Sequence, residues 1–469
     1  MNLRVCSTSL RSYSSVSLAS ILVLAGAAAC SSSSTGMNDT QTHPDASSST
    51  DSGGHPKTEG GTTPGDDSGS ENDGGNPESG GDDGSPENDG GDDSGPEPDG
   101  GGGHWTTMTL PGDHDVDEVT GIFYSSPTKG FVVTVPGDDA IAGAVLSTTA
   151  TTVTGIAFDG NVDTSAGGVL GGLQFSGLVP TAAGGLVAVT DLSDLVSAPS
   201  FTGAFTNVAN SQNLGIGQIA GAYFGAGFTL LAQDQNGFYK APSAPGPNAS
   251  YTDIFDPGSD PTVPDPIPSN ECQDPVLVND SFATGLTVVA FSSDASTIAY
   301  TTYSDADGVP EVCVSTDGGH SFLPTELAGK PEEMPSGVIF PNPSAPSTII
   351  VYDASLDDAT SNYVLRSVNG GTSFSSVTLP SSFATKEIQL FGSFFLADGL
   401  HGWIVGYDGD ADTGLALVTT DGGQTWAYDT TGIAAATSSG TVKLHSIFAL
   451  DTTHIWIGGE LGALIAYTP

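Results

Sequence analysis

The stretch TTDGGQTW, residues 419–426, is a short run of turn-forming residues that ends in an aromatic side chain. Two near-copies stand upstream, STDGGHSF at 315–322 and SVNGGTSF at 367–374, and the three starts are 52 residues apart both times. A fixed spacing of this size is typical of stacked or radial repeat architectures. We call these three segments the repeat turns.

The residues between two repeat turns indicate what one repeat contains. Four apolar runs read as strands, at 388–395, 401–407, 415–419 and 425–428. Four antiparallel strands per repeat make one blade of a β-propeller. The 366 residues from His104 onward hold close to seven such units, with weaker strand patterns at 119–158, 168–206 and 215–255. The sequence therefore predicts an all-β fold, a single seven-bladed β-propeller over 104–469.

Both ends of this region carry an incomplete repeat. The segment GGGHWTTMTLP at 101–111 matches GGTSFSSVTLP at 370–380, which predicts an outermost strand at 105–110 with nothing before it. The C-terminal segment 445–469 supplies three strands and stops. Pairing the two ends completes one blade and removes two strand edges that would otherwise invite aggregation. We therefore expect the N- and C-terminal strands to close the propeller.

The repeat turns follow the pattern SxDxGxTW, and in this the chain resembles the Asp-box (BNR) repeats of sialidases, sortilin-type receptors, xyloglucan-degrading hydrolases and photosystem II assembly factors. The resemblance is carried by three blades, over roughly 270–430, and it implies a structural hairpin turn. An acidic or amide oxygen accepts the turn's own N–H groups, and glycine supplies backbone angles that other residues avoid. The residues so assigned are Ser315, Asp317, Gly319, Phe322, Ser367, Asn369, Gly371, Phe374, Thr419, Asp421, Gly423 and Trp426. Asn369 lacks the charge of its counterparts, which favours a structural role.

The N-terminus reads as an export signal over 1–29. Arg4 and Arg11 precede an apolar run, 21–29, that is too short to span a bilayer. Three alanines before Cys30 and four serines after it resemble a bacterial lipobox, although position 27 holds Ala where the family has Leu. The resemblance implies acylation of Cys30 and a lipid anchor in the bacterial cell envelope, with the outer membrane favoured by Ser31. The alternative is cleavage by an ordinary signal peptidase and simple secretion.

Residues 30–103 lack the apolar side chains that folding requires. After Cys30 the segment has no aromatic residue, and it carries 17 acids against one base, Lys57. Such a composition cannot offset the entropy of ordering by burial, and like charges extend the chain. We expect a disordered acidic linker that separates the propeller from the membrane.

Beyond the export segment and Cys30, two cysteines remain, Cys272 and Cys313. In an exported protein they predict a single disulfide, the alternative being two unpaired buried thiols.

The charge of the 104–469 region excludes several partners and activities. It holds 38 acids against six bases, so a phosphate backbone or a bare anionic bilayer is not an expected partner. Sialidases grip their substrate with three arginines, whereas Arg366 is the single arginine of this region. With so many carboxylates, a catalytic pair cannot be picked out by sequence. We expect that the protein does not bind nucleic acid. We expect it to attach to the membrane through the lipid only.

Acidic loops follow the second strand of three repeats, at 303–308, 352–358 and 407–414, on the face opposite the repeat turns. In the last of them Asp408, Asp410 and Asp412 alternate as the ligands of calcium loops do. The loop departs from an EF-hand, because Thr413 and Thr419 replace the required glycine and closing glutamate. Calcium at these aspartates is one hypothesis, and a solvated hairpin tip is the other; no further cofactor is expected.

These patterns together predict a membrane-anchored, monomeric, non-catalytic binding or scaffolding propeller that presents an acidic loop face to a protein or glycan partner. The alternatives are a carbohydrate-active enzyme of the glycoside hydrolase type and a calcium-dependent adhesin.

Overall fold

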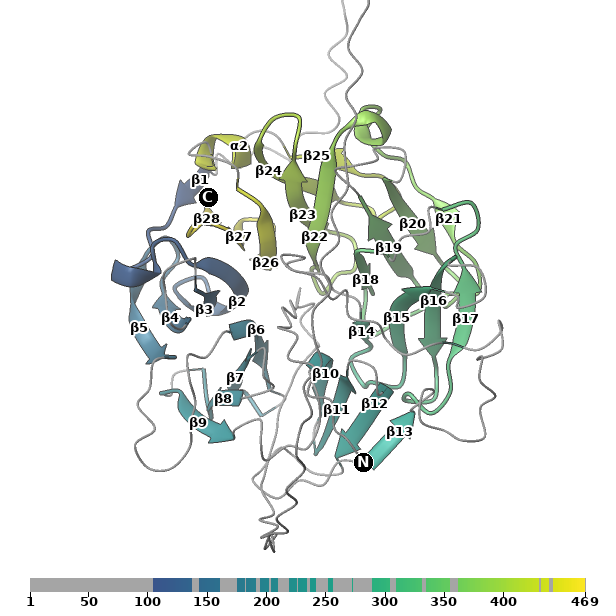
Figure 1. Cartoon of the computed structure of the whole chain (residues 1–469), viewed down its shortest axis with the longest axis horizontal. Helices are drawn as coiled ribbons and strands as arrows, with labels where there is room; N and C mark the ends of the chain where they lie inside the picture. The colour runs from purple at the N-terminus through teal and green to yellow at the C-terminus, as the bar shows by residue number, and fades with distance from the viewer. Residues whose placement is uncertain are drawn as a thin grey trace, which may run out of the picture. The chain divides into compact units, whose positions relative to one another are not determined.

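The structure is a computed structural model of the whole chain (Figure 1). It describes residues 104–136, 143–160, 175–181, 183–190, 195–201, 204–209, 219–225, 227–233, 237–241, 252–255, 272, 289–303, 309–330, 335–354, 362–429, 432–437 and 442–468. The expected export signal, Cys30 and the acidic linker lie outside these residues, as do Asp305, Asp307 and 355–358 of the acidic loops.

The described strands form seven four-stranded antiparallel sheets, which we number I to VII in chain order. Sheet I contains β2 (Glu118–Ser126), β3 (Lys129–Val135), β4 (Ala144–Thr148) and β5 (Val153–Asp159). Sheet II contains β6 (Phe175–Pro180), β7 (Leu186–Thr190), β8 (Leu195–Ala198) and β9 (Thr206–Ala209). Sheet III contains β10 (Ile219–Gly225), β11 (Phe228–Gln233), β12 (Gly237–Ala241) and β13 (Thr252–Phe255). All three coincide with the weaker strand patterns of the sequence.

The next three sheets carry the repeat turns between their third and fourth strands. Sheet IV contains β14 (Val289–Phe291), β15 (Ile298–Tyr303), β16 (Pro310–Ser315) and β17 (Leu323–Glu326). Sheet V contains β18 (Gly337–Ile339), β19 (Ile349–Asp353), β20 (Tyr363–Ser367) and β21 (Ser375–Ser376). Sheet VI contains β22 (Ile388–Phe395), β23 (Gly402–Asp408), β24 (Thr413–Thr419) and β25 (Ala427–Tyr428). Strand β25 begins later than expected because the Trp426 N–H donates instead to the carbonyl of Thr378, in the segment after β21, at 2.9 Å.

Sheet VII is built from both ends of the described chain. It contains β26 (Leu444–Asp451), β27 (His454–Gly459), β28 (Leu464–Thr468) and, beside β28, the first strand β1 (His104–Thr107). Trp105 stands opposite Tyr467, and their rings lie 5.3 Å apart. The expected strand at 105–110 is therefore shorter and begins one residue earlier. Beyond it, the Met108 N–H still donates to the Leu464 carbonyl at 2.7 Å, and Leu110 is buried just before Pro111.

Helical structure is confined to short segments among the described residues. These are the 3-10 helices η1 (Gly112–His114) and η3 (Phe383–Thr385) and the single-turn helix α2 (Ile433–Ala436). None of the helices in the described part of the chain has the length and apolar character needed to span a bilayer.

The first strands of neighbouring sheets approach one another closely. Figure 1 shows the sheets following one another in chain order, and β2 packs against both β6 and β26. A β-bulge near the start of β2 and of β22 brings a glycine to this contact. A Cβ on Gly121 would lie 2.6 Å from the Leu178 amide nitrogen, and one on Gly392 would lie 2.3 Å from the His445 carbonyl. Glycine is required at both bulges because backbone, rather than side chain, fills the space.

Side-chain hydroxyl groups of one sheet donate hydrogen bonds to backbone carbonyl groups of the next sheet. Thr120 donates to the Phe175 carbonyl of sheet II at 2.5 Å. Tyr352 of sheet V donates to the Phe391 carbonyl of sheet VI, and Ser446 of sheet VII donates to the Val119 carbonyl of sheet I. Apolar packing continues outward, since Trp456 of sheet VII stacks on Tyr124 of sheet I with centroids 3.5 Å apart. The core is thus distributed between sheets.

Cys272 and Cys313 are joined by a disulfide in the structure. Both residues are buried in one apolar cluster with Phe291 and Tyr300 of sheet IV. The bond ties a residue that precedes β14 to strand β16 of the same sheet.

Candidate functional site

Each sheet has two ends that carry different connections. The connections between first and second strands and the repeat turns lie at one end, the turn end. The connections between second and third strands, and the segments that enter each first strand, lie at the other, which we call the loop end. The loop end of sheets VI, VII and I includes 111–117, 380–387, 409–412 and 460–462.

The repeat turns direct their polar atoms to their own backbone. In the third turn, one carboxylate oxygen of Asp421 accepts the N–H groups of Gln424 and Thr425 at 2.9 and 3.0 Å. The hydroxyl groups of Thr419 and Thr425 donate to the same carboxylate. The Gly423 N–H donates to the Thr419 hydroxyl, and Gly423 has a φ of 79°.

The other two turns repeat this arrangement. Asp317 accepts the N–H groups of His320 and Ser321, and Gly319 donates to Ser315. In the second turn the Asn369 amide oxygen accepts the Ser373 N–H at 3.1 Å, and the Gly371 N–H donates to Ser367. Aromatic residues that close the turns pack inward: Phe322 and Trp426 are buried, and Phe374 packs against the core of sheets IV and V. The turns therefore stabilise the hairpins, because their acidic or amide oxygens accept hydrogen bonds from the turn itself.

Hydrogen bonding sets the pKa of the two turn aspartates. Burial alone raises the pKa of Asp421, but the donors from Thr425, Thr419 and Gln424 outweigh it and hold the pKa below its ordinary value of 3.8. Asp317 has its pKa lowered in the same way by Ser321, Ser315 and His320. A carboxyl whose pKa is lower in the folded state stabilises the fold above its unfolded pKa and loses this contribution as the pH falls through the folded value.

We expect the Asp421→Ala variant to lose about 2 kcal/mol of unfolding free energy, because two backbone N–H groups lose a charged acceptor. Asp421→Asn should lose less than about 1 kcal/mol, since Asn369 fills the matching position in the second turn. Urea unfolding at pH 7 measures both values. Between pH 5 and 2 the stability of Asp421→Asn should fall less steeply than that of the wild type. Equal losses for Ala and Asn would contradict the hydrogen-bonding role.

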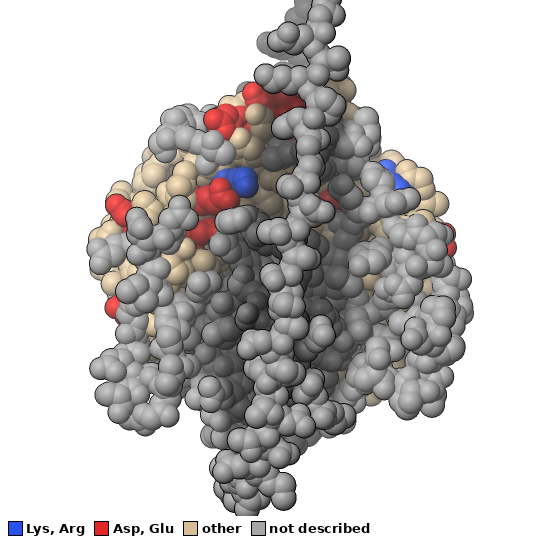
Figure 2. All heavy atoms as spheres, in the orientation of Figure 1, with Lys and Arg blue, Asp and Glu red and all other residues tan. Residues whose placement is uncertain are grey.

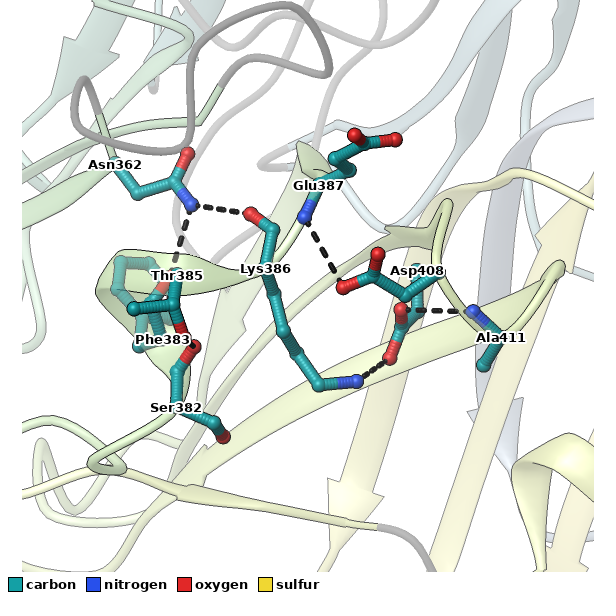
Figure 3. Close-up of polar contacts among 9 residues, drawn as sticks. Asn362, Ser382, Phe383, Thr385, Lys386, Glu387, Asp408 and Ala411 are labelled. Carbon is teal, nitrogen blue, oxygen red and sulfur yellow. Dashed lines mark hydrogen bonds and ion pairs between the residues drawn. The ribbon is translucent and has the colours of Figure 1, made fainter. Parts of the chain in front are cut away.

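The loop end of sheet VI centres on an ion pair between Lys386 and Asp408 (Figure 3). Asp408 closes β23, and its other oxygen accepts the Ala411 N–H at 3.2 Å. Lys386 is held in place because Asn362 donates to the carbonyls of Phe383 and Lys386, both at 2.9 Å. The Lys386 ammonium also lies 5.6 Å from the centroid of the Tyr428 ring.

The aspartates of the calcium hypothesis are engaged by three different donors. Asp408 accepts from Lys386, Asp410 from the Glu387 N–H at 3.4 Å, and Asp412 from the Tyr407 hydroxyl at 2.5 Å. Among the described residues, no group of three or more His, Cys, Asp or Glu side chains is placed to hold a metal ion. A calcium ion at this loop would have to displace the Lys386 ammonium. Calcium binding here stays a prediction, which the melting temperature in millimolar calcium against sodium at equal ionic strength would check.

We expect the Lys386→Met variant to lose about 3 kcal/mol of unfolding free energy. The side chain of Asp408 is 8% exposed, so removing its cation leaves a largely buried carboxylate unpaired. The double variant Lys386→Met with Asp408→Asn should regain most of this loss. Chemical unfolding of the single and double variants measures the difference, and a single variant as stable as wild type would show that the pair contributes nothing.

Tyr428 lies under this ion pair as a neutral group. Its pKa is raised to about 12, mainly by burial. The hydrogen bond with Ser382 lowers the pKa, and the negative charges of Asp408 and Asp410 raise it further. The phenol therefore remains protonated at neutral pH and serves as a packing surface for Lys386.

A second polar cluster lies where sheet VII meets sheet I. Asp117 is fully buried and accepts from His114 and Thr134, both at 2.7 Å. Beside it, His445 Nε2 lies 3.6 Å from a Glu118 oxygen and 3.5 Å from a Glu460 oxygen. Lys443 pairs with Glu460 at 3.6 Å.

The sequence motifs described above do not include Lys386, His445 or Glu460. The signal for His445 is present in the first strands, because it occupies the bulge position of LHS at 444–446. The same bulge position is filled by Thr120 in VTG at 119–121 and by Phe391 in LFG at 390–392. The first strands thus share a position that the repeat turns do not contain.

Acidic side chains dominate the charged surface in view. Figure 2 shows the larger groups of acidic atoms in its upper half, with few lysine or arginine atoms among them. Such a surface favours cationic partners.

No protein-family model matches the chain, and no curated protein matches its sequence. Solved structures match its fold. YCF48 from Cyanidioschyzon merolae superimposes with a TM-score of 0.50 at 12% identity, over 78% of this chain and 99% of that one. A structure of YCF48 bound to a D1 peptide has a TM-score of 0.49 at 11% identity, over 78% of this chain and 97% of that one. The GH74 enzyme of Niastella koreensis has a TM-score of 0.46 at 15% identity, over 77% of this chain and 53% of that one.

The likeness to YCF48, together with the antiparallel four-stranded sheets, identifies the fold as a β-propeller. At this level of identity it establishes the fold alone.

Proposed function

We propose that this chain is a lipid-anchored, non-catalytic binding or scaffolding protein built on a closed, seven-bladed Asp-box propeller. The seven sheets serve as blades, and the pairing of β1 with β28 joins the two ends of the ring. Residues 1–29 direct export, acylated Cys30 anchors the chain in the cell envelope, and 31–103 act as an acidic spacer. The outer membrane is the favoured location.

The binding role is inferred from the contrast between the turn end and the loop end. The most recurrent polar motif of the chain satisfies its own backbone at the turn end, so it builds the scaffold. The loop end, by contrast, exposes Asp410, Ala411 and Asp412 of sheet VI. A rigid propeller that presents exposed loops at one end is suited to binding a protein or glycan partner.

Site-specific photo-cross-linking on intact cells tests this role. A benzophenone side chain at Ala411 probes the loop end of sheet VI, and one at Gln424 probes the turn end of the same sheet; both positions are exposed. We expect a discrete cross-linked product from position 411 and none from 424. The proposal would be refuted if both positions gave the same cross-linked products. It would also be refuted if neither position gave a product and the protein bound nothing on a glycan array.

The anchor is tested separately with the Cys30→Ser variant. Wild-type cells should incorporate radiolabelled palmitate into the protein, and the variant should not. Incorporation into both would place the lipid elsewhere.

A further inference from the structure

The turn between β27 and β28 has an unusual residue at its tip. The Ala463 N–H donates to the Glu460 carbonyl at 3.0 Å, and both central residues have positive φ, 54° at Leu461 and 70° at Gly462. This is the φ pattern of a type I′ turn, whose central positions favour Asn, Asp and Gly. A leucine here crowds its own backbone, so local stability does not account for it.

The turn is pressed against the segment that connects β1 to β2. The Gly462 N–H donates to the Asp117 carbonyl at 2.8 Å, and a Cβ on Gly462 would lie 2.1 Å from the Asp115 carbonyl oxygen. Residues from the two ends of the described chain thus meet through their backbones. The contact fixes the direction in which Leu461 projects.

Two apolar side chains stand exposed at this junction. Leu461 is 60% exposed, and Val116, in the segment that the turn touches, is 47% exposed. Six large hydrophobic residues are exposed among those the structure describes, and these two belong to loops in direct contact. Both residues thus lie at the loop end in segments whose backbones touch, and we call the two together the apolar spot.

Carboxylates border this spot. Asp115 is exposed beside Val116, and Glu460 precedes Leu461 in the turn. Burial alone raises the pKa of Glu460, but His445 and Lys443 outweigh it and keep the carboxyl ionised. A second copy of this chain, or its own acidic linker, would bring further negative charge to the spot and be repelled. A cationic segment would be attracted by Asp115 and would share Glu460 with Lys443, whose ammonium lies 3.6 Å from it.

We propose that Leu461 and Val116, flanked by Asp115 and Glu460, are the docking point for a protein segment that carries a bulky apolar side chain next to Lys or Arg. The inference rests on the proposed binding function and specifies the partner's chemistry at the loop end. The apolar side chain would cover Leu461 and Val116, and the cation would lie against the carboxylates.

Selection from a display library of random 12-residue peptides against the full chain tests the docking point. We expect enriched peptides to combine Lys or Arg with a neighbouring Leu, Phe or Trp. The affinity of these peptides for the Leu461→Asn variant should be at least tenfold lower than for the wild type. The double variant Asp115→Asn with Glu460→Gln should bind them about threefold more weakly, and this binding should depend less on salt concentration. Leu323→Asn, on the outer strand β17, is the matched control, because Leu323 is 75% exposed. The selected peptides should bind this variant with the same affinity as the wild type.

The Leu461→Asn variant also has a stability readout that does not need a ligand. Asparagine tolerates positive φ, so the melting temperature should rise by about 1–2 °C, whereas Leu323→Asn should not raise it. A variant that binds less while melting higher separates docking from folding.

The outcomes distinguish this inference from the broader proposal. Selected peptides that bind Leu461→Asn as well as wild type would overturn the docking point while leaving a binding function intact. Failure to enrich any peptide overturns the docking point as well. The function itself falls only if the cross-linking and glycan-array experiments also give nothing.

Discussion

Deleting residues 104–110 should abolish cooperative folding of the propeller or lower its melting temperature by more than about 15 °C. The deletion removes β1, which leaves the edge of β28 unpaired, and it removes the buried side chains of Met108 and Leu110. Each of these two side chains is worth about 2–5 kcal/mol on truncation, so their sum approaches the whole stability of a typical domain. An unpaired β28 edge should also promote aggregation.

A deletion of equal length within the linker, residues 96–102, is the control for shortening the chain. Calorimetry and size-exclusion chromatography should show that this control melts and elutes like the wild type. The single variant Met108→Ala should lie between the two, with a loss of about 3 kcal/mol. A 104–110 deletion that melts like the intact chain would refute the closure of the propeller by its two ends.

Replacing Cys272 and Cys313 by serine should lower the unfolding free energy by about 4 kcal/mol. The bond closes a loop with a sequence separation of 41 residues, and the cross-link restricts the unfolded chain more as the loop lengthens. Both positions are also buried in the apolar cluster of sheet IV, so the serine hydroxyl groups add a desolvation cost. Urea unfolding of the oxidised wild type and the double variant measures the difference.

Reductant distinguishes the disulfide from the effect of the substitutions. It should destabilise the wild type and leave the double variant unchanged. Alkylation of the denatured, non-reduced protein should label neither Cys272 nor Cys313. A reductant-insensitive wild type would mean that the two thiols do not pair in solution, which is the alternative that the sequence left open.

The sequence predicted the parts of this protein that depend on short segments. The repeat turns are encoded within eight residues, because Asp421, Thr419 and Gly423 make their hydrogen bonds inside the turn. Strand runs in sheets I to III were visible without that motif, because short apolar runs between turn-forming residues mark them. Trp105 was assigned to an outermost strand by its likeness to Phe374, and the structure places it opposite Tyr467.

Contacts between sheets could not be predicted in this way. Lys386, in the segment before β22, pairs with Asp408 at the end of β23, where the sequence alone left a calcium loop and a solvated hairpin tip as alternatives. His445 meets Glu118 only because β26 packs beside β2, more than 300 residues away in the chain.

The sequence by itself determined the turn chemistry, the four-stranded repeat and the strongly acidic character of the protein, because each follows from local residue types. Only the tertiary structure decided which charges are paired and which apolar side chains stand exposed. Leu461 illustrates the difference: its letter gives no sign of positive φ, which it adopts in the β27–β28 turn, nor of its place beside the segment of Asp115, which Gly462 touches. The docking of sheet against sheet sets these positions, and that docking depends on many buried contacts at once.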